Sequence, residues 1–250
     1  YWINGDFDKA IVNFNKALDL CGEFQGDYIK VEAINGLGNV YITLERFDQA
    51  LTFYNQALDI AEEQKFTILI SKILNNLGTL HEELRNSQIG LEYYQRSYNK
   101  SLEIEDYYGM AIADLNTGNM HFSLKNIEQA KKYLNKAVEY SKENGKTLLL
   151  AHTYFTIGSM SQENNEYEKS IEEFLIAVEK ALESKDSKIL FRIYIQLARS
   201  YKLIKAFDKA EEVYKMGIEV ANQIGMHELH SNVYEQMALF YQENGKTAKA

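Results

Sequence analysis

The clearest hydrophobic pattern in the chain lies between residues 34 and 57, where two runs with helical spacing are separated by a short polar break. In each run, small residues stand beside large ones on one face of a helix with about 3.6 residues per turn. Small side chains let two helix backbones approach, and neighbouring rings fill the space beside them. The segment therefore predicts a helical hairpin that packs on both sides. Its face residues are Ile34, Leu37, Gly38 and Tyr41 in the first helix, and Ala50, Tyr54 and Ala57 in the second.

The same pattern returns every 40 residues, with no insertion or deletion anywhere in the chain. Three columns of small residues keep this period, one in the first helix of each hairpin and two in the second. Because chance would not align three columns at one fixed spacing, the sequence predicts a repeat protein. The columns are Gly38, Gly78, Gly118, Gly158, Ala198 and Ala238; Ala10, Ala50, Gly90, Ala130, Ser170, Ala210 and Ala250; and Ala17, Ala57, Ser97, Ala137, Ala177 and Gly217.

The period also predicts the domain organisation. Each hairpin would contact only its neighbours, so the whole of residues 1–250 is expected to form one all-α solenoid domain, truncated mid-repeat at both ends. The expected repeats are a partial one at 1–26, then 27–66, 67–106, 107–146, 147–186 and 187–226, and a partial one at 227–250. Helices are expected to begin at Phe7, Asp27, Phe47, Thr67, Ser87, Tyr107, Ile127, Lys146, Tyr167, Ser187 and Phe207.

The columns resemble the tetratricopeptide repeat, and the resemblance covers the whole chain. Two departures are a period of 40 rather than the common ~34, and the absence of proline. The longer period is similar to a subgroup found in bacterial signalling and peptide-sensing proteins, kinesin light chains and spindle-orientation adaptors. The resemblance implies a right-handed superhelix of about six helical hairpins plus partial repeats at both ends, with a concave groove for extended peptides. Besides the hairpin at 34–57, the best match is Tyr194, Leu197, Ala198, Tyr201, Ala210 and Tyr214.

Composition narrows the possible partners. A formal net charge of −9 and a pI near 5.2 argue against a general nucleic-acid binder and against a binder of anionic membranes. No apolar run approaches the ~20 residues that a membrane-spanning helix needs. The single cysteine, Cys21, cannot form an intrachain disulfide and reads as a structural thiol. These features predict a cytoplasmic protein with no nucleic-acid partner and no membrane insertion.

The sequence contains none of the common catalytic or cofactor-binding motifs. Phosphate-binding glycine loops, the GxSxG elbow and CxxC pairs are all missing. His81 and His121 replace Tyr41 in its column, where a packed, hydrogen-bonded side chain is the expected role. His227 and His230 share a helix face, but no further metal ligands stand near them in the sequence. We therefore predict no catalysis, no cofactor and no metal.

The positions that face away from the packing columns carry the functional prediction. In the first helix of each hairpin, they lie at offsets −6, −3, −2, +1 and +4 from the small residue, and we name them the inner face. Asparagines gather there in three consecutive repeats. An amide offers a donor and an acceptor, so such residues could hold the backbone of an extended peptide. The alternative is a solvated face, since asparagine is common in this chain. The asparagines are Asn35, Asn39, Asn75, Asn76, Asn116 and Asn119.

Further along the chain the inner face becomes basic. Arg192, Arg199 and Lys202 form one stripe, which would suit an acidic side chain or a terminal carboxylate. The alternative is an ordinary solvated helix face, paired with glutamates of adjacent helices such as Glu163. The peptide-binding residues predicted besides the asparagines are Lys72, Phe155, Arg192 and Arg199.

The predicted function is therefore that of a protein- or peptide-binding module, the sensory or regulatory part of a larger signalling protein. Two alternatives are a regulator acting directly on a response-regulator protein, in the manner of a phosphatase, and a structural assembly scaffold. Because both ends fall mid-repeat, each carries an unpaired packing surface. Head-to-tail association of copies is expected, through Phe14 at one end and Tyr234, Met237 and Tyr241 at the other.

Overall fold

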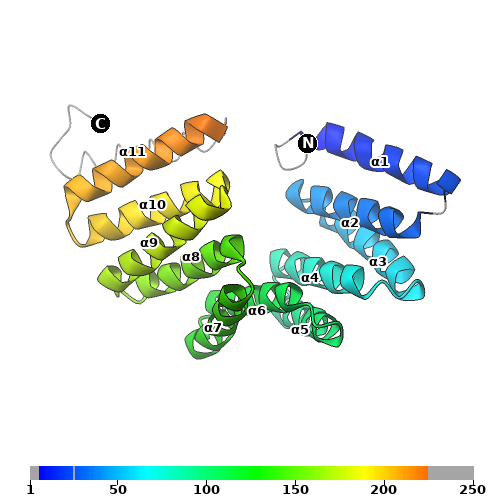
Figure 1. The fold of residues 1–250 in the computed structure, drawn as a ribbon, viewed down its shortest axis with the longest axis horizontal. Coiled ribbons are helices and arrows are strands. Elements are labelled where there is room, and N and C mark those ends of the chain that lie inside the picture. The colour runs from blue at the N-terminus through cyan, green and yellow to red at the C-terminus, as the bar shows by residue number, and fades with distance from the viewer. Residues whose placement is uncertain (1–5, 25, 225–250) are drawn as a thin grey trace. The chain divides into compact units, whose positions relative to one another are not determined.

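A computed structural model of the protein describes residues 6–24 and 26–224, and in these residues it contains eleven α-helices and no strand (Figure 1). Every helix has 17 or 18 residues and begins 20 residues after the one before it. The helices are α1 (Phe7–Phe24), α2 (Asp27–Thr43), α3 (Phe47–Glu63), α4 (Thr67–Glu83), α5 (Ser87–Glu103), α6 (Tyr107–Ser123), α7 (Ile127–Glu143), α8 (Thr147–Glu163), α9 (Tyr167–Ser184), α10 (Ser187–Leu203) and α11 (Phe207–Ile224).

The all-α fold and the helices expected in this part of the chain are confirmed. The predicted starts coincide with the observed ones except at α8, which begins at Thr147 rather than Lys146. A further helix was expected near residues 227–243. That segment lies outside the described residues, as do His227, His230 and the C-terminal residues of the predicted head-to-tail contact. The even-numbered helices α2 to α10 are the first helices of the hairpins, and the odd-numbered ones are the second helices.

One turn geometry connects the consecutive helices from α2 to α11. At Glu45, for example, the backbone has a φ of 55°, and its N–H donates to the carbonyl of Ile42 at 2.8 Å. The next N–H, that of Arg46, reaches back to the carbonyl of Tyr41 at 2.8 Å. These two bonds form a Schellman motif, which satisfies carbonyls at the helix end. The residues with positive φ recur every 20 positions: Glu45, Lys65, Arg85, Glu105, Lys125, Gly145, Asn165, Lys185 and Lys205.

Side-chain hydrogen bonds cap the N-termini of only some of the described helices. Asn86 precedes α5 but makes no side-chain cap bond. Asp106 accepts from the N–H of Gly109 at 3.0 Å, and Asp186 accepts from the N–H of Ile189 at 2.9 Å. The backbone explains the difference, because ψ is 59° at Asn86 but 82° and 97° at the two aspartates. A more extended N-cap directs its side chain towards the free N–H groups.

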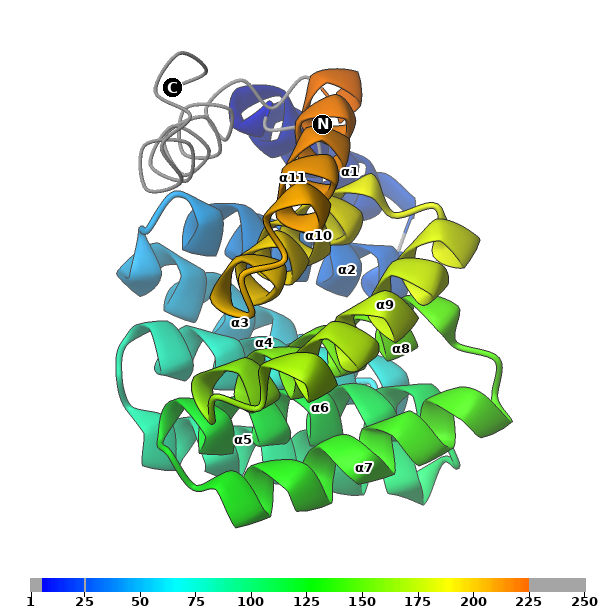
Figure 2. The same cartoon turned by 90° about the vertical axis from the view of Figure 1, so that its left-hand side faces the viewer.

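The chain divides into two compact units, residues 1–133 (unit 1) and 134–250 (unit 2). Within each unit, consecutive helices pack side by side as antiparallel neighbours (Figures 1 and 2). The first helices also contact one another, α2 with α4 and α4 with α6 in unit 1, and α8 with α10 in unit 2. Among the described helices of one unit, no two second helices approach as closely. The first helices therefore line the tighter side of each stack.

The small-residue column packs as the sequence predicts. A Cβ atom added at Gly38 would lie 2.5 Å from the ring of Tyr54, and one at Gly158 would lie 2.8 Å from the ring of Phe174. Both rings are fully buried. At these two contacts the absence of a side chain allows the first helix to lie directly on the ring of the second.

A second ring column lies nearer the helix ends. Tyr41 stacks on Phe53 at 5.2 Å between centroids, and His81 stacks on Tyr93 at 5.3 Å. His121 stacks in the same way, so the packed role expected for both histidines is confirmed. The expected hydrogen bond is absent at Nδ1, which is buried and has no partner in either ring. Burial lowers the pKa of both histidines, because an apolar site disfavours the charged ring.

Candidate binding surface

All ten residues predicted to bind a peptide lie on first helices, in two separate groups. Seven belong to α2, α4 and α6 of unit 1, and three belong to α8 and α10 of unit 2. The unit 1 group is Asn35, Asn39, Lys72, Asn75, Asn76, Asn116 and Asn119, and the unit 2 group is Phe155, Arg192 and Arg199.

In unit 1 the asparagines bind one another across the helices. Asn76 Nδ2 donates to Asn35 Oδ1 at 2.9 Å, and Asn116 Nδ2 donates to Asn75 Oδ1 at 2.9 Å. We name these two contacts the amide pairs. All four side chains are half-buried. Because a bonded pair uses one NH2 group and one carbonyl, each pair keeps one NH2 group and one carbonyl for an outside partner.

A second set of contacts ties the inner face of unit 1 to the buried rings. The hydroxyl of Tyr54 donates to Asn39 Oδ1 at 2.6 Å. In the next repeat, the hydroxyl of Tyr94 is 3.2 Å from that of Thr79 and donates to Glu82 Oε2 at 3.1 Å. Burial raises the pKa of Glu82, and the hydrogen bond from Tyr94 opposes that rise. Side chains anchored in this way are held in one orientation before any ligand arrives.

Two of the predicted unit 1 residues, Lys72 and Asn119, give less support to a peptide-binding site. Lys72 forms an ion pair with Glu32 at 3.9 Å, in which both side chains are at least half exposed. Such a pair contributes little to stability, about 0–1 kcal/mol. Asn119 is half-buried in α6, in the column of Asn39.

In unit 2 the inner face is aromatic and cationic. Phe155 occupies the column of Asn35 and Asn75, and its ring lies 6.0 Å from that of Phe174. The guanidinium of Arg192 sits over Phe155, with Cζ 4.9 Å from the ring centroid. Phenylalanine offers no amide, so unit 2 has no counterpart of the amide pairs at this column.

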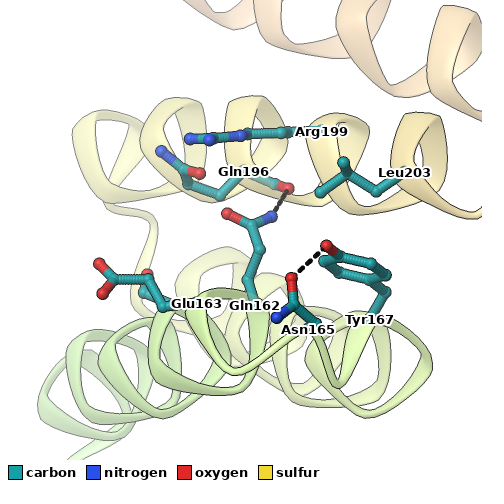
Figure 3. A pocket seen from close by; sticks show the side chains of 8 residues that line it. Gln162, Glu163, Asn165, Tyr167, Gln196, Arg199 and Leu203 are labelled. Carbon is teal, nitrogen blue, oxygen red and sulfur yellow. Dashed lines mark hydrogen bonds between the residues drawn. The ribbon is translucent and has the colours of Figure 1, made fainter.

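A pocket of about 520 Å³ opens between α8 and α10, beside the α8–α9 turn (Figure 3). Its floor includes Gln162, which is only 8% exposed. Gln162 Nε2 donates to the carbonyl of Gln196 at 3.0 Å and to Ser200 Oγ at 2.6 Å. At one side the hydroxyl of Tyr167 donates to Asn165 Oδ1 at 2.5 Å. The lining residues are Ser159, Gln162, Glu163, Asn165, Tyr167, Gln196, Arg199 and Leu203.

Only Arg199 among the predicted site residues lines this pocket. The sequence did contain a signal for two of the others. Gln196 stands in the column of Asn76 and Asn116, and Gln162 stands in the column of Glu82. Following the amide columns beyond the asparagines would have selected Gln196.

Other kinds of site are limited by what the described residues contain. No group of three or more histidine, cysteine, aspartate or glutamate side chains in this part of the chain could hold a metal ion. In the same residues, no helix combines the length and the apolar character that crossing a bilayer requires.

Two family models of the tetratricopeptide repeat match the chain, at residues 1–63 and 107–144. The sequence matches no curated protein. BtubC (BKLC) from P. vanneervenii is similar in structure with a TM-score of 0.71 at 19% identity, over 88% of this chain and 92% of that chain.

Two further structures are longer than this chain. Aspartyl phosphate phosphatase F from Bacillus subtilis has a TM-score of 0.73 at 17% identity, over 98% of this chain and 64% of that one. The Rap conjugation gene regulator of the plasmid pLS20, in complex with the Phr* peptide, has a TM-score of 0.74 at 16% identity. The match covers 89% of this chain and 61% of that one. This chain therefore spans less than two thirds of either protein. Tetratricopeptide repeats are therefore matched at residues 1–63 and 107–144, and the chain shares the fold of these helical-hairpin proteins.

Proposed function

We propose that this chain is a non-catalytic binding module that holds an extended peptide, or an extended segment of a protein, on the inner faces of its first helices. The amide pairs carry the proposal. Each keeps one NH2 group and one carbonyl, and a peptide unit needs an acceptor and a donor of just that kind. Two such pairs, Asn35–Asn76 and Asn75–Asn116, lie on neighbouring helices of one unit. The backbone of an extended peptide could form hydrogen bonds with both amide pairs, whatever the side chains of the peptide.

Two further observations support a peptide as the ligand. Asparagine is a poor helix former, so four of them inside helices need a compensating role. One structure of similar fold, the Rap conjugation gene regulator, is a complex with a peptide. At 16% identity that likeness concerns the fold, so the ligand class rests on the amides of this chain. We further propose a cytoplasmic setting, as the sensory or regulatory part of a signalling protein.

The test uses a displayed library of random linear peptides selected on the whole chain. Peptides that are enriched are then measured by calorimetry against the wild type and a double variant, Asn75→Ala with Asn116→Ala. The variant removes one complete amide pair. We expect affinity to fall at least about tenfold, because a desolvated peptide group loses its partners.

A matched control is Asn55→Ala, which removes an exposed amide from the second helix α3. It should leave affinity within about twofold, a difference smaller than one hydrogen bond contributes. Thermal unfolding of all variants shows whether the fold is kept. Failure to enrich any peptide, or equal binding by the double variant, would overturn the proposal.

The second candidate is a regulator that acts directly on a response-regulator protein. It draws on the likeness in fold to aspartyl phosphate phosphatase F, which covers 64% of that protein. No contact on the inner face favours it over peptide binding. The two functions separate in the same variants, because loss of the amide pair should weaken peptide binding but leave direct action on a protein surface unchanged.

A further inference from the structure

We propose that the pocket between α8 and α10 receives a single carboxylate of the bound peptide, from an acidic side chain or from the C-terminus, and that Arg199 is the residue that binds it. The inference deepens the proposed peptide function and rests on it for the identity of the ligand. It adds a chemical preference that the amide pairs of unit 1 cannot provide.

The first observation is the state of Arg199. Its side chain is exposed at the pocket, and it forms no ion pair or hydrogen bond with any described residue. The chain carries 36 acidic residues against 27 basic ones, so carboxylates are abundant around most cations. Glu163 lines the same pocket, but Arg199 forms no ion pair with it. A guanidinium left open at a concave site is suited to a bidentate bond with a carboxylate from outside.

The second observation is the fixed floor of the pocket. Both hydrogens of Gln162 Nε2 are used, one on the carbonyl of Gln196 and one on Ser200 Oγ. Ser200 is held in turn by the hydroxyl of Ser170 at 2.8 Å. Gln162 Oε1 is thereby oriented, and no donor among the described residues bonds to it. It can accept the backbone N–H of a residue whose carboxylate lies at Arg199.

The third observation concerns the side chain of Gln196. In Figure 3 its amide lies beside the guanidinium of Arg199, on the same helix. In unit 1 the corresponding column pairs with an asparagine of the preceding first helix, but here Phe155 stands in that place. The amide of Gln196 consequently makes no side-chain hydrogen bond with a described residue. It supplies a second donor next to the cation.

The remaining walls limit what the pocket accepts. Leu203, 41% exposed, and the ring of Tyr167 lie on the side away from the guanidinium, where they can cover methylene groups (Figure 3). Glu163 stands on the α8 side of the opening and repels a second negative charge. One cation opposite one carboxylate suits a monoanion better than a phosphate dianion. The pocket therefore fits one acidic residue, or one chain terminus.

The experiment follows the pocket directly by NMR on the whole chain labelled with nitrogen-15. Three small probes are titrated: N-acetylglutamic acid N-methylamide, the corresponding glutamine compound, and N-acetylalanine. The first has a side-chain carboxylate, the second has none, and the third has a terminal carboxylate. The signals are the Nε–Hε group of Arg199 and the side-chain amides of Gln162 and Gln196.

At least one of the two acids should bind about fivefold tighter than the glutamine probe, the factor expected for roughly 1 kcal/mol from a partly exposed ion pair. The advantage should vanish in Arg199→Gln. It should remain in Lys188→Gln, which removes the same charge from an exposed position on the same helix outside the pocket. Whichever acid binds more tightly identifies the source of the carboxylate.

Equal affinity for all three probes, or no shift of the Arg199 signal up to about 20 mM, a limit far weaker than useful binding, would overturn the inference. So would an acid preference that survives in Arg199→Gln. These probes are too short to span the amide pairs. A negative result here therefore leaves the proposed function intact, whereas an unsuccessful peptide selection leaves the carboxylate test valid.

Discussion

The inner faces of the two units use the same columns for different chemistry. In unit 1 the columns of Asn75 and Asn76 hold amides that bond to those of adjacent helices. In unit 2 the first of these columns holds Phe155, so Gln196 in the second has no amide to bond and faces the pocket. Phenylalanine in place of asparagine at one repeat position thus leaves the neighbouring amide of Gln196 without a side-chain partner among the described residues.

The buried ring shows the same contrast. Tyr54 and Tyr94 are buried in unit 1, and their hydroxyls bond to side chains of the inner face. Phe174 fills the same position in unit 2 and has no hydroxyl. Tyr214 fills it in α11, so the missing hydroxyl distinguishes the α8–α9 hairpin and not the whole of unit 2. Packing columns restrict residue size, whereas inner columns are free to vary in chemistry.

The largest expected effect comes from the packing that both units share. Gly78→Val should destabilise the chain by about 3 kcal/mol, because a Cβ there would lie 2.5 Å from Tyr94 Cδ1. Gly158→Val should cost less, about 2 kcal/mol, since its nearest ring atoms are 2.8 Å away. Urea unfolding measures both values.

Hydrogen exchange sharpens this comparison. In a repeat array each hairpin is coupled to its neighbours, so Gly78→Val should raise exchange first in α3 to α6. Uniform loss of protection along the chain would contradict that coupling. A cost below about 1 kcal/mol for Gly78→Val would show that the ring can move aside.

The second test exchanges the ring chemistry of the two units. Tyr94→Phe removes the hydroxyl bound to Thr79 and Glu82 and should cost about 1 kcal/mol. The pKa of Glu82 should rise further, because the carboxylate loses a donor while it stays buried. Carbon-13 NMR of the glutamate side chains follows that pKa.

The reverse exchange is Phe174→Tyr in unit 2. Ser159 stands there in the column of Thr79, so the new hydroxyl has a partner and stability should change by less than about 0.5 kcal/mol. A loss as large as that of Tyr94→Phe would mean that the unit 2 face cannot accept the link that unit 1 uses.

Much of this architecture follows from the sequence. The 40-residue period placed almost every helix start, because one turn geometry repeats without insertions. The glycine column predicted close contact with a ring, and Gly38 lies against Tyr54. Both are consequences of steric size, which a column of residue types reveals directly.

The hydrogen bonds within the inner face could not be predicted in the same way. The partners Asn35 and Asn76 are 41 residues apart, so the bond runs diagonally between two columns. A list of columns shows that amides gather but not that they bond to one another. The pocket depends on the orientation of Gln162, which Ser200 and the backbone of Gln196 determine. Such geometry emerges only once three helices are packed.

A third test uses the turns, where the units differ by one glycine. Lys65 has a φ of 57°, an unfavourable value for a residue with a Cβ atom, so Lys65→Gly should stabilise the chain by about 0.5–1 kcal/mol. Gly145 already has a φ of 62°, and Gly145→Ala should cost about 1 kcal/mol. Thermal unfolding compares the two. The two changes in unfolding free energy should have opposite signs. If Lys65→Gly lowered stability, positive φ would not be a source of strain at this turn.

The smallest effect concerns pH and the histidines of unit 1. Burial holds the pKa of His81 and His121 below the ordinary value of 6.5, so the unfolded chain binds more protons just below that pH. Their contribution to stability is complete above pH 6.5 and is lost as the pH falls towards the folded pKa. His81→Phe with His121→Phe, which keeps the ring stacking, should flatten stability between pH 7.5 and 5.5. An unchanged slope would contradict the shifts.

The constant 20-residue spacing has a consequence for how such a chain can change over generations. Since the junctions from α2 to α11 share one geometry, a stretch of 40 residues in this range can be duplicated or deleted in the gene and still join its new neighbours correctly. An inserted hairpin brings its own inner columns, which are then free to diverge. A binding surface of this kind can lengthen by copying and specialise afterwards, so that the amides of one unit and the open arginine of the other can arise from one ancestral hairpin.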